Sequence, residues 1–133
     1  MKNMRSLIVL SVLAIILSSC SKEAGEGGSA SITGKVWVLD YNSEYTEINS
    51  RYYGVKEDVY LVYGDDVVYS RSYETSYDGS YRFQYLRKGK YKVFAYSEDT
   101  TGTVPGGVFA VIRELEITEK NQNIVLDDLV IVK

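Results

Sequence analysis

The chain has 133 residues, with 15 Lys and Arg side chains against 18 Asp and Glu side chains, one Cys, one Pro and no His. Its formal net charge of −3 argues against a nucleic-acid partner, because proteins that bind nucleic acids usually carry a basic surface. Without His, the chain has no Ser-His-Asp relay, no His-ligated zinc and no imidazole base for catalysis near neutral pH.

Residues 1–19 have the pattern of a secretory signal peptide. Lys2 and Arg5 give the segment a positive start, and residues 7–17 are apolar except for Ser11. This apolar run is shorter than the about 20 residues that a helix needs to cross the hydrocarbon core of a bilayer. We therefore expect an exported protein without a transmembrane helix.

The signal peptide runs into the sequence Leu-Ser-Ser-Cys at positions 17–20. This order of an apolar residue, two small residues and Cys resembles the lipobox of bacterial lipoproteins. The resemblance implies cleavage before Cys20 and a diacylglyceryl group on its thiol, so that fatty acids such as palmitate anchor the mature chain in a membrane. Because Cys20 is the only Cys, the exported domain then has neither a free thiol nor a disulfide.

A flexible tether is predicted for residues 20–30, because residues 21–30 contain no large apolar side chain. Such a segment spans roughly 15–20 Å on average. Lys22, Glu23 and Glu26 also resemble the acidic export signal that sends lipoproteins of some Gram-negative bacteria to the outer face of the cell. The expected location is the outer membrane, at the cell surface, with the periplasmic face as the alternative.

Residues 31–133 have the length of one domain, and strands are predicted for most of them. A first strand at residues 32–39 precedes the polar residues 40–54, which are expected to form a long loop. Residues 58–63 alternate their apolar side chains between two faces and therefore predict a central strand.

Turn residues separate the remaining predicted strands. Asp78-Gly79 suits the positive φ angles of a tight hairpin, and a loop at residues 100–107 contains the only Pro, Pro105. The predicted strands after residue 63 are residues 67–75, 80–86, 90–96, 108–117 and 124–132. About seven strands with short connections predict an all-β fold, a single antiparallel β-sandwich, with a closed barrel as the alternative.

Residues 75–93 read T-x-x-D-G-S-Y-x-F-x-x-L-x-x-G-x-Y-x-V, and Gly34-Lys35-Val36 supplies a Gly-x-Val near the start of the domain. These two patterns resemble the carboxypeptidase-regulatory-like and Cna-B-like families of small transthyretin-like sandwiches. The resemblance implies that Tyr81, Phe83 and Leu86 point into the core. It identifies a fold better than a function.

Four tyrosines in the expected first loop are the candidate ligand-binding residues. They are Tyr41, Tyr45, Tyr52 and Tyr53. A Tyr side chain offers a flat apolar ring with a polar tip, which suits contacts with a glycan or a protein. The alternative is that these rings cover the open end of the sandwich.

No catalytic residue, metal site or cofactor is predicted. The adjacent carboxylates Asp65-Asp66 and Asp127-Asp128 would point to opposite faces of a strand, so neither pair suits acid–base catalysis. Residues 40–44 alternate oxygen-bearing side chains as a calcium loop does, but they lack its turn Gly and its bidentate Glu.

The sequence thus predicts a non-enzymatic lipoprotein, anchored through Cys20, that presents a β-sandwich to a protein or glycan partner. One alternative is a structural or assembly component of the cell envelope. A second alternative is a hydrolase that uses a pair of carboxylates. The sequence pattern leaves the identity of the ligand and the oligomeric state open.

Overall fold

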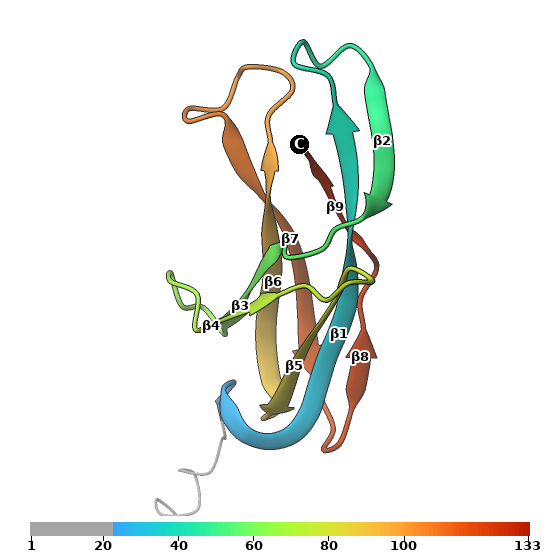
Figure 1. Ribbon diagram of the computed structural model, residues 1–133. Helices are drawn as coiled ribbons and strands as arrows, with labels where there is room; N and C mark the ends of the chain where they lie inside the picture. Colours follow the sequence, from blue (N-terminus) through green and yellow to red (C-terminus); the bar gives the residue numbers. More distant parts are fainter. Residues whose placement is uncertain (1–22) are drawn as a thin grey trace, which may run out of the picture.

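The computed structural model describes residues 23–133, which form two β-sheets packed against each other (Figure 1). The predicted all-β sandwich is confirmed, with nine strands in place of the about seven expected. The predicted signal peptide, residues 1–19, and Cys20 lie outside the described residues. Within residues 23–133, no helix is long and apolar enough to cross a membrane.

The strands have the following bounds: β1 (Glu26–Tyr41), β2 (Ile48–Tyr53), β3 (Asp58–Tyr63), β4 (Arg71–Glu74), β5 (Ser80–Leu86), β6 (Gly89–Glu98), β7 (Val108–Ile117), β8 (Asn123–Val125) and β9 (Leu129–Val132).

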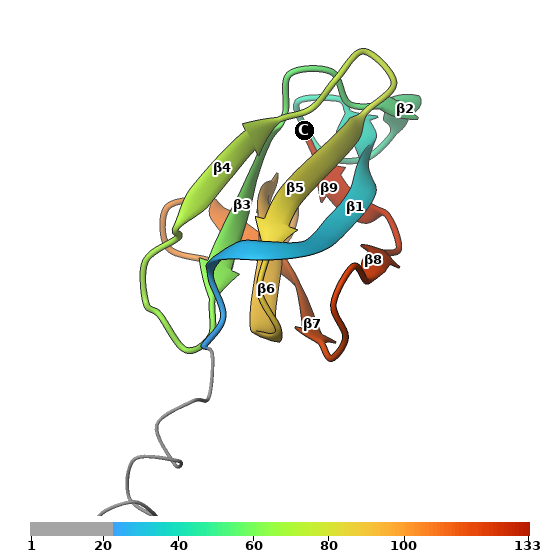
Figure 2. The same cartoon turned by 90° about the horizontal axis from the view of Figure 1, so that it is seen from below.

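Strand β1 organises the larger sheet. Its first part pairs with β5 in antiparallel and with β8 in parallel, and its last part pairs with β2 in antiparallel and with β9 in parallel. The other sheet has the order β4-β3-β6-β7 and is antiparallel throughout. Figure 2 shows β1 curving past the end of β5 at the N-terminal end of the molecule.

Alternate side chains of both sheets fill the space between them. Tyr81, Phe83 and Leu86 of β5 are at most 1% exposed, as the sequence predicts, and Tyr91 and Val93 of β6 are equally buried. Each such side chain contributes roughly 1.5–3 kcal/mol when it is fully buried. Because residues 23–133 contain no Cys, no disulfide joins the two sheets there. Backbone hydrogen bonds hold the strands within each sheet, and side-chain packing holds the two sheets together.

The prediction of a long loop at residues 40–54 is wrong, because this stretch forms a hairpin. β1 continues through Tyr41 and β2 begins at Ile48. The side-chain oxygen of Asn42 closes the tip by accepting a hydrogen bond from the backbone N–H of Thr46 at 2.9 Å. β2 is an edge strand with no buried side chain, so its sequence has no inward apolar residues to reveal a strand.

The predicted tether is shorter than residues 20–30, because β1 already begins at Glu26. Ala30 is 1% exposed and belongs to the core, and a side chain at Gly28 would collide with the backbone of Leu86. The small residues of this stretch therefore let two backbones approach closely. Composition alone does not distinguish this role from that of a flexible linker.

Two further strand boundaries differ from the prediction. The strand predicted at residues 67–75 is reduced to β4, and Val67 is 99% exposed in the connection before it. The strand predicted at residues 124–132 is divided into β8 and β9, which pair with different parts of β1. Both differences occur at sheet edges, where a strand has only one neighbour to fix its backbone.

Ala30→Asp should lower the free energy of unfolding by about 3–5 kcal/mol, because it places an unpaired carboxylate in the core. Ser29→Asp, one residue earlier on an exposed position, should change it little. Urea unfolding of the chain from Ser21 to Lys133 measures both. Equal stability of the two variants would mean that this stretch is a tether after all.

Candidate functional site

Four aromatic rings gather on the outer face of the sheet β4-β3-β6-β7. The neighbours of Tyr60 on both sides along β3 are buried in the core, so Tyr60 points outward. The same alternation turns Phe94 and Tyr96 of β6 outward, and the strand register places Phe94 opposite Tyr60. Tyr69, in the connection between β3 and β4, adds the fourth ring. We call Tyr60, Tyr69, Phe94 and Tyr96 the aromatic face.

The rings of the aromatic face contact one another around Tyr60. Its centroid lies 5.0 Å from that of Phe94 in a stacked arrangement, 4.7 Å from that of Tyr69 and 5.7 Å from that of Tyr96. Phe94 and Tyr96 also meet edge to face, with centroids 5.5 Å apart. Such contacts stabilise each ring by roughly 0.5–1.5 kcal/mol beyond its burial and hold it in a defined orientation.

The aromatic face is open to solvent. Tyr69 is 49% exposed and Tyr96 is 53% exposed. Ile112 of β7, which pairs with Phe94, extends the apolar surface and is 48% exposed. Exposed apolar surface of this kind, gathered on one sheet face, is typical of a binding site.

Charged groups border the aromatic face. Lys92 Nζ lies 4.0 Å from Glu114 Oε1, and the pair lies one outward position along the strands from Phe94. Burial and, to a smaller extent, the carboxylate of Asp58 raise the pKa of Tyr60 above its ordinary value. The face therefore combines flat apolar rings with hydrogen-bonding groups at its border.

The four tyrosines predicted from the sequence do not form one site. Tyr41 and Tyr45 lie at the β1–β2 hairpin, with ring centroids 6.3 Å apart, and the Tyr45 hydroxyl donates a hydrogen bond to Glu98 Oε2 at 2.9 Å. Figure 1 shows this hairpin and the β6–β7 hairpin at the end of the molecule opposite the N-terminal end. Tyr45 therefore joins the two hairpins.

Tyr53 and Tyr52 lie on opposite faces of β2. Tyr53 pairs with Trp37 on the outer face, where the ring centroids are 4.8 Å apart, and Lys35 Nζ lies 4.6 Å from the Tyr53 centroid. Its hydroxyl donates a hydrogen bond to Asp128 Oδ2 at 3.1 Å. Tyr52 pairs with the buried Val38 and is 41% exposed. A ligand-binding role for these four tyrosines stays a prediction.

Two of the carboxylates that the sequence singled out accept hydrogen bonds from side chains of β2. Asp128 accepts the Tyr53 hydroxyl, and Asp40 Oδ2 accepts a hydrogen bond from Ser50 Oγ at 3.1 Å. Asn42 uses its side-chain oxygen within the hairpin. Among residues 23–133, no group of three or more His, Cys, Asp or Glu side chains is placed to hold a metal ion.

Comparison with known proteins adds little to this description. No protein-family model matches the chain, and no curated protein matches it. The crystal structure of a candidate carbohydrate-binding protein from Pseudomonas aeruginosa is similar with a TM-score of 0.47 and 14% sequence identity, over 78% of this chain and 91% of that chain. A likeness this distant says nothing of what the present chain binds. The resemblance to carboxypeptidase-regulatory-like and Cna-B-like domains stays a prediction.

Sequence reasoning missed the aromatic face, although part of the signal was present. The alternation in β3 and β6 already places Tyr60, Phe94 and Tyr96 at outward positions. Their shared location depends on the pairing of β3 with β6, which the alternation does not give. Tyr69 follows a turn and has no periodic signal at all.

Glu98→Gln should lower the pKa of Tyr45 toward that of a free tyrosine. The Tyr45 pKa is raised mainly by its hydrogen bond to the Glu98 carboxylate, which favours the protonated phenol. NMR titration of ring-labelled tyrosines measures the change, with Glu47→Gln at the tip of the same hairpin as the control. A Tyr45 pKa that is the same in wild type and Glu98→Gln would contradict the link between the two hairpins.

Proposed function

We propose that the chain is a non-enzymatic binding module, anchored to a membrane by lipid on Cys20, which holds a carbohydrate on the aromatic face. The observation that carries this proposal is the gathering of Tyr60, Tyr69, Phe94 and Tyr96 on one sheet face that the rest of residues 23–133 leaves open.

The chemistry of a sugar ring fits this face. A sugar presents C–H groups on its flat sides, which stack on aromatic rings, and hydroxyl groups around its edge. The phenol groups of Tyr69 and Tyr96 and the charged groups of Lys92 and Glu114 lie where such hydroxyls would need partners. Tyr60, Phe94 and Tyr96 stand on paired strands, and Tyr69 packs on Tyr60, so little side-chain freedom is lost on binding.

The position of the N-terminal end supports an upright domain on the membrane. Ala24 packs on the core, and the backbone N–H of Gly25 donates a hydrogen bond to Tyr91 Oη at 2.9 Å. Only Ser21 and Lys22 separate Cys20 from the first described residue, so the anchor lies within about 10 Å of the domain. On a domain anchored in this way, a ligand beside the membrane can reach the outer faces of both sheets.

An assembly role is the second candidate, and the exposed edge of β2 favours it. This strand lies at the end of its sheet, and none of its side chains is buried. A strand from another protein could extend the sheet there through backbone hydrogen bonds.

Tyr96→Ala and Tyr69→Ala should each weaken carbohydrate binding by about 2- to 10-fold, which corresponds to about 0.5–1.5 kcal/mol of ring contact. Tyr77→Ala, at a tyrosine that is 88% exposed in the connection before β5, is the matched control. A glycan array of the chain from Ser21 to Lys133 identifies the ligand, and calorimetry compares the variants. Carbohydrate binding that is the same in all three variants, or binding of protein ligands alone, would contradict the proposal.

Cys20→Ala should release the protein from the membrane fraction, because the thiol that carries the lipid is lost. Wild-type protein should sediment with membranes, and protease added to intact cells should remove it if the domain faces the cell surface. Protection of membrane-bound wild-type protein would instead place the domain in the periplasm. Sedimentation that does not depend on Cys20 would rule out the lipid anchor.

A further inference from the structure

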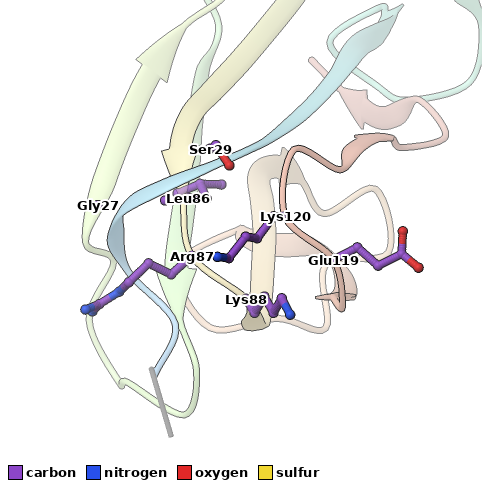
Figure 3. A pocket seen from close by; sticks show the side chains of 8 residues that line it. Gly27, Ser29, Leu86, Arg87, Lys88, Glu119 and Lys120 are labelled. Atoms are coloured by element: carbon purple, nitrogen blue, oxygen red, sulfur yellow. The ribbon is translucent and has the colours of Figure 1, made fainter. Parts of the chain in front are cut away.

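A basic pocket lies at the end of the sandwich where the described chain begins. It has a volume of about 650 Å³ and is lined by Gly27, Gly28, Ser29, Leu86, Arg87, Lys88, Glu119 and Lys120. These residues come from the start of β1, the β5–β6 turn and the β7–β8 connection. We call this the basal pocket. Figure 3 shows its lining: Lys120 extends toward the base of the Arg87 side chain, the guanidinium group of Arg87 extends away from Lys120, and the carboxylate of Glu119 is directed away from both.

The basal pocket is locally positive on an acidic domain. Residues 23–133 hold 12 Lys and Arg side chains against 18 Asp and Glu side chains, yet three cations and one carboxylate line the pocket. Within the described part of the chain, the ion pairs are Arg71–Glu26, Lys92–Glu114 and Lys133–Glu57. None of the cations that line the basal pocket takes part in them.

Arg87 gives independent support for an anionic ligand. Its Nε atom is buried and has no hydrogen-bond partner among the described residues. Buried donors in folded proteins normally have an acceptor, which makes this side chain unusual among residues 23–133. The planar guanidinium group is also the side chain best suited to a phosphate, because it can donate two parallel hydrogen bonds.

The backbone of residues 27–29 leaves the β1–β5 ladder where it lines the pocket. Glu26 and Ala30 both pair with Leu86, so the three residues between them bulge out of the β1–β5 ladder. Gly27 has a φ of 103° in this bulge, which a residue with a side chain rarely adopts. Backbone N–H groups outside a ladder can bind an anion.

We propose that the basal pocket binds the phosphate groups of anionic lipids in the membrane on which the domain stands. The inference rests on the proposed anchor for its geometry, because Cys20 lies only three residues before Glu23. A cluster of cations beside a lipid anchor strengthens attachment to an anionic surface and fixes the side of the domain that faces it. The aromatic face is then turned away from the bilayer surface and toward neighbouring molecules.

Vesicle binding by the chain from Ser21 to Lys133 tests this proposal without the anchor. Wild-type protein should bind vesicles of phosphatidylcholine with phosphatidylglycerol, and it should bind pure phosphatidylcholine vesicles far more weakly. The double variant Arg87→Gln, Lys120→Gln should bind the anionic vesicles roughly 30-fold more weakly, because two cations near the surface are lost. Added salt should reduce the binding of the wild type.

The variant Arg51→Gln, Lys56→Gln is the matched control, since it removes the same charge from exposed positions in and after β2. Thermal unfolding of both variants checks that the fold is intact. Equal weakening in both variants, or binding that does not depend on phosphatidylglycerol, would overturn the proposal. Binding of inorganic phosphate without vesicle binding would also overturn it and would indicate a site for a free phosphate compound.

The outcome of the vesicle-binding experiment does not depend on whether Cys20 carries lipid, because the tested chain lacks Cys20. If Cys20→Ala leaves the cell fractionation unchanged while the soluble chain binds anionic vesicles through Arg87 and Lys120, the anchor fails and the lipid site stands. If the anchor is present and the soluble chain ignores anionic vesicles, the basal pocket proposal fails and the binding module stands.

Discussion

The larger sheet depends on one strand, because β2, β5, β8 and β9 all pair with β1. The change of partners along β1 occurs near Gly34. A side chain at Gly34 would collide with the ring of Tyr81, which lies over this position from β5. The absence of a side chain there thus lets a large ring fill the core at the point where β1 passes from one pair of neighbours to the other.

This arrangement gives the molecule two different ends. At one end, the start of β1 packs beside the β5–β6 turn and forms the basal pocket. At the other end, Tyr45 and Glu98 join the two long hairpins. Between them, the outer face of the second sheet carries the aromatic face. The proposed lipid site and the proposed carbohydrate site therefore lie on different parts of the domain, one at its N-terminal end and one on a sheet face.

Sheet edges explain where sequence reasoning succeeded and where it failed. Central strands such as β3, β5 and β6 bury one face, so their apolar residues alternate, and their positions and inward residues were predictable. Edge segments such as β2, and the small residues 24–30 at the start of β1, bury little side-chain surface. Their place in a sheet comes from backbone pairing, which leaves no apolar pattern in the sequence.

Residue type and local alternation were enough to predict the fold class, a turn at Asp78-Gly79, the inward side chains of β5 and the absence of imidazole chemistry. The tight hairpin expected at that turn is wrong, because β4 and β5 belong to different sheets and do not pair. Which outward residues meet depends on the tertiary structure. Tyr60 stacks on Phe94 because β3 pairs with β6, and Arg87 and Lys120 line the same pocket because two distant turns share one end of the sandwich. Alternation is a local property of the chain, whereas strand order brings together residues that are far apart in it.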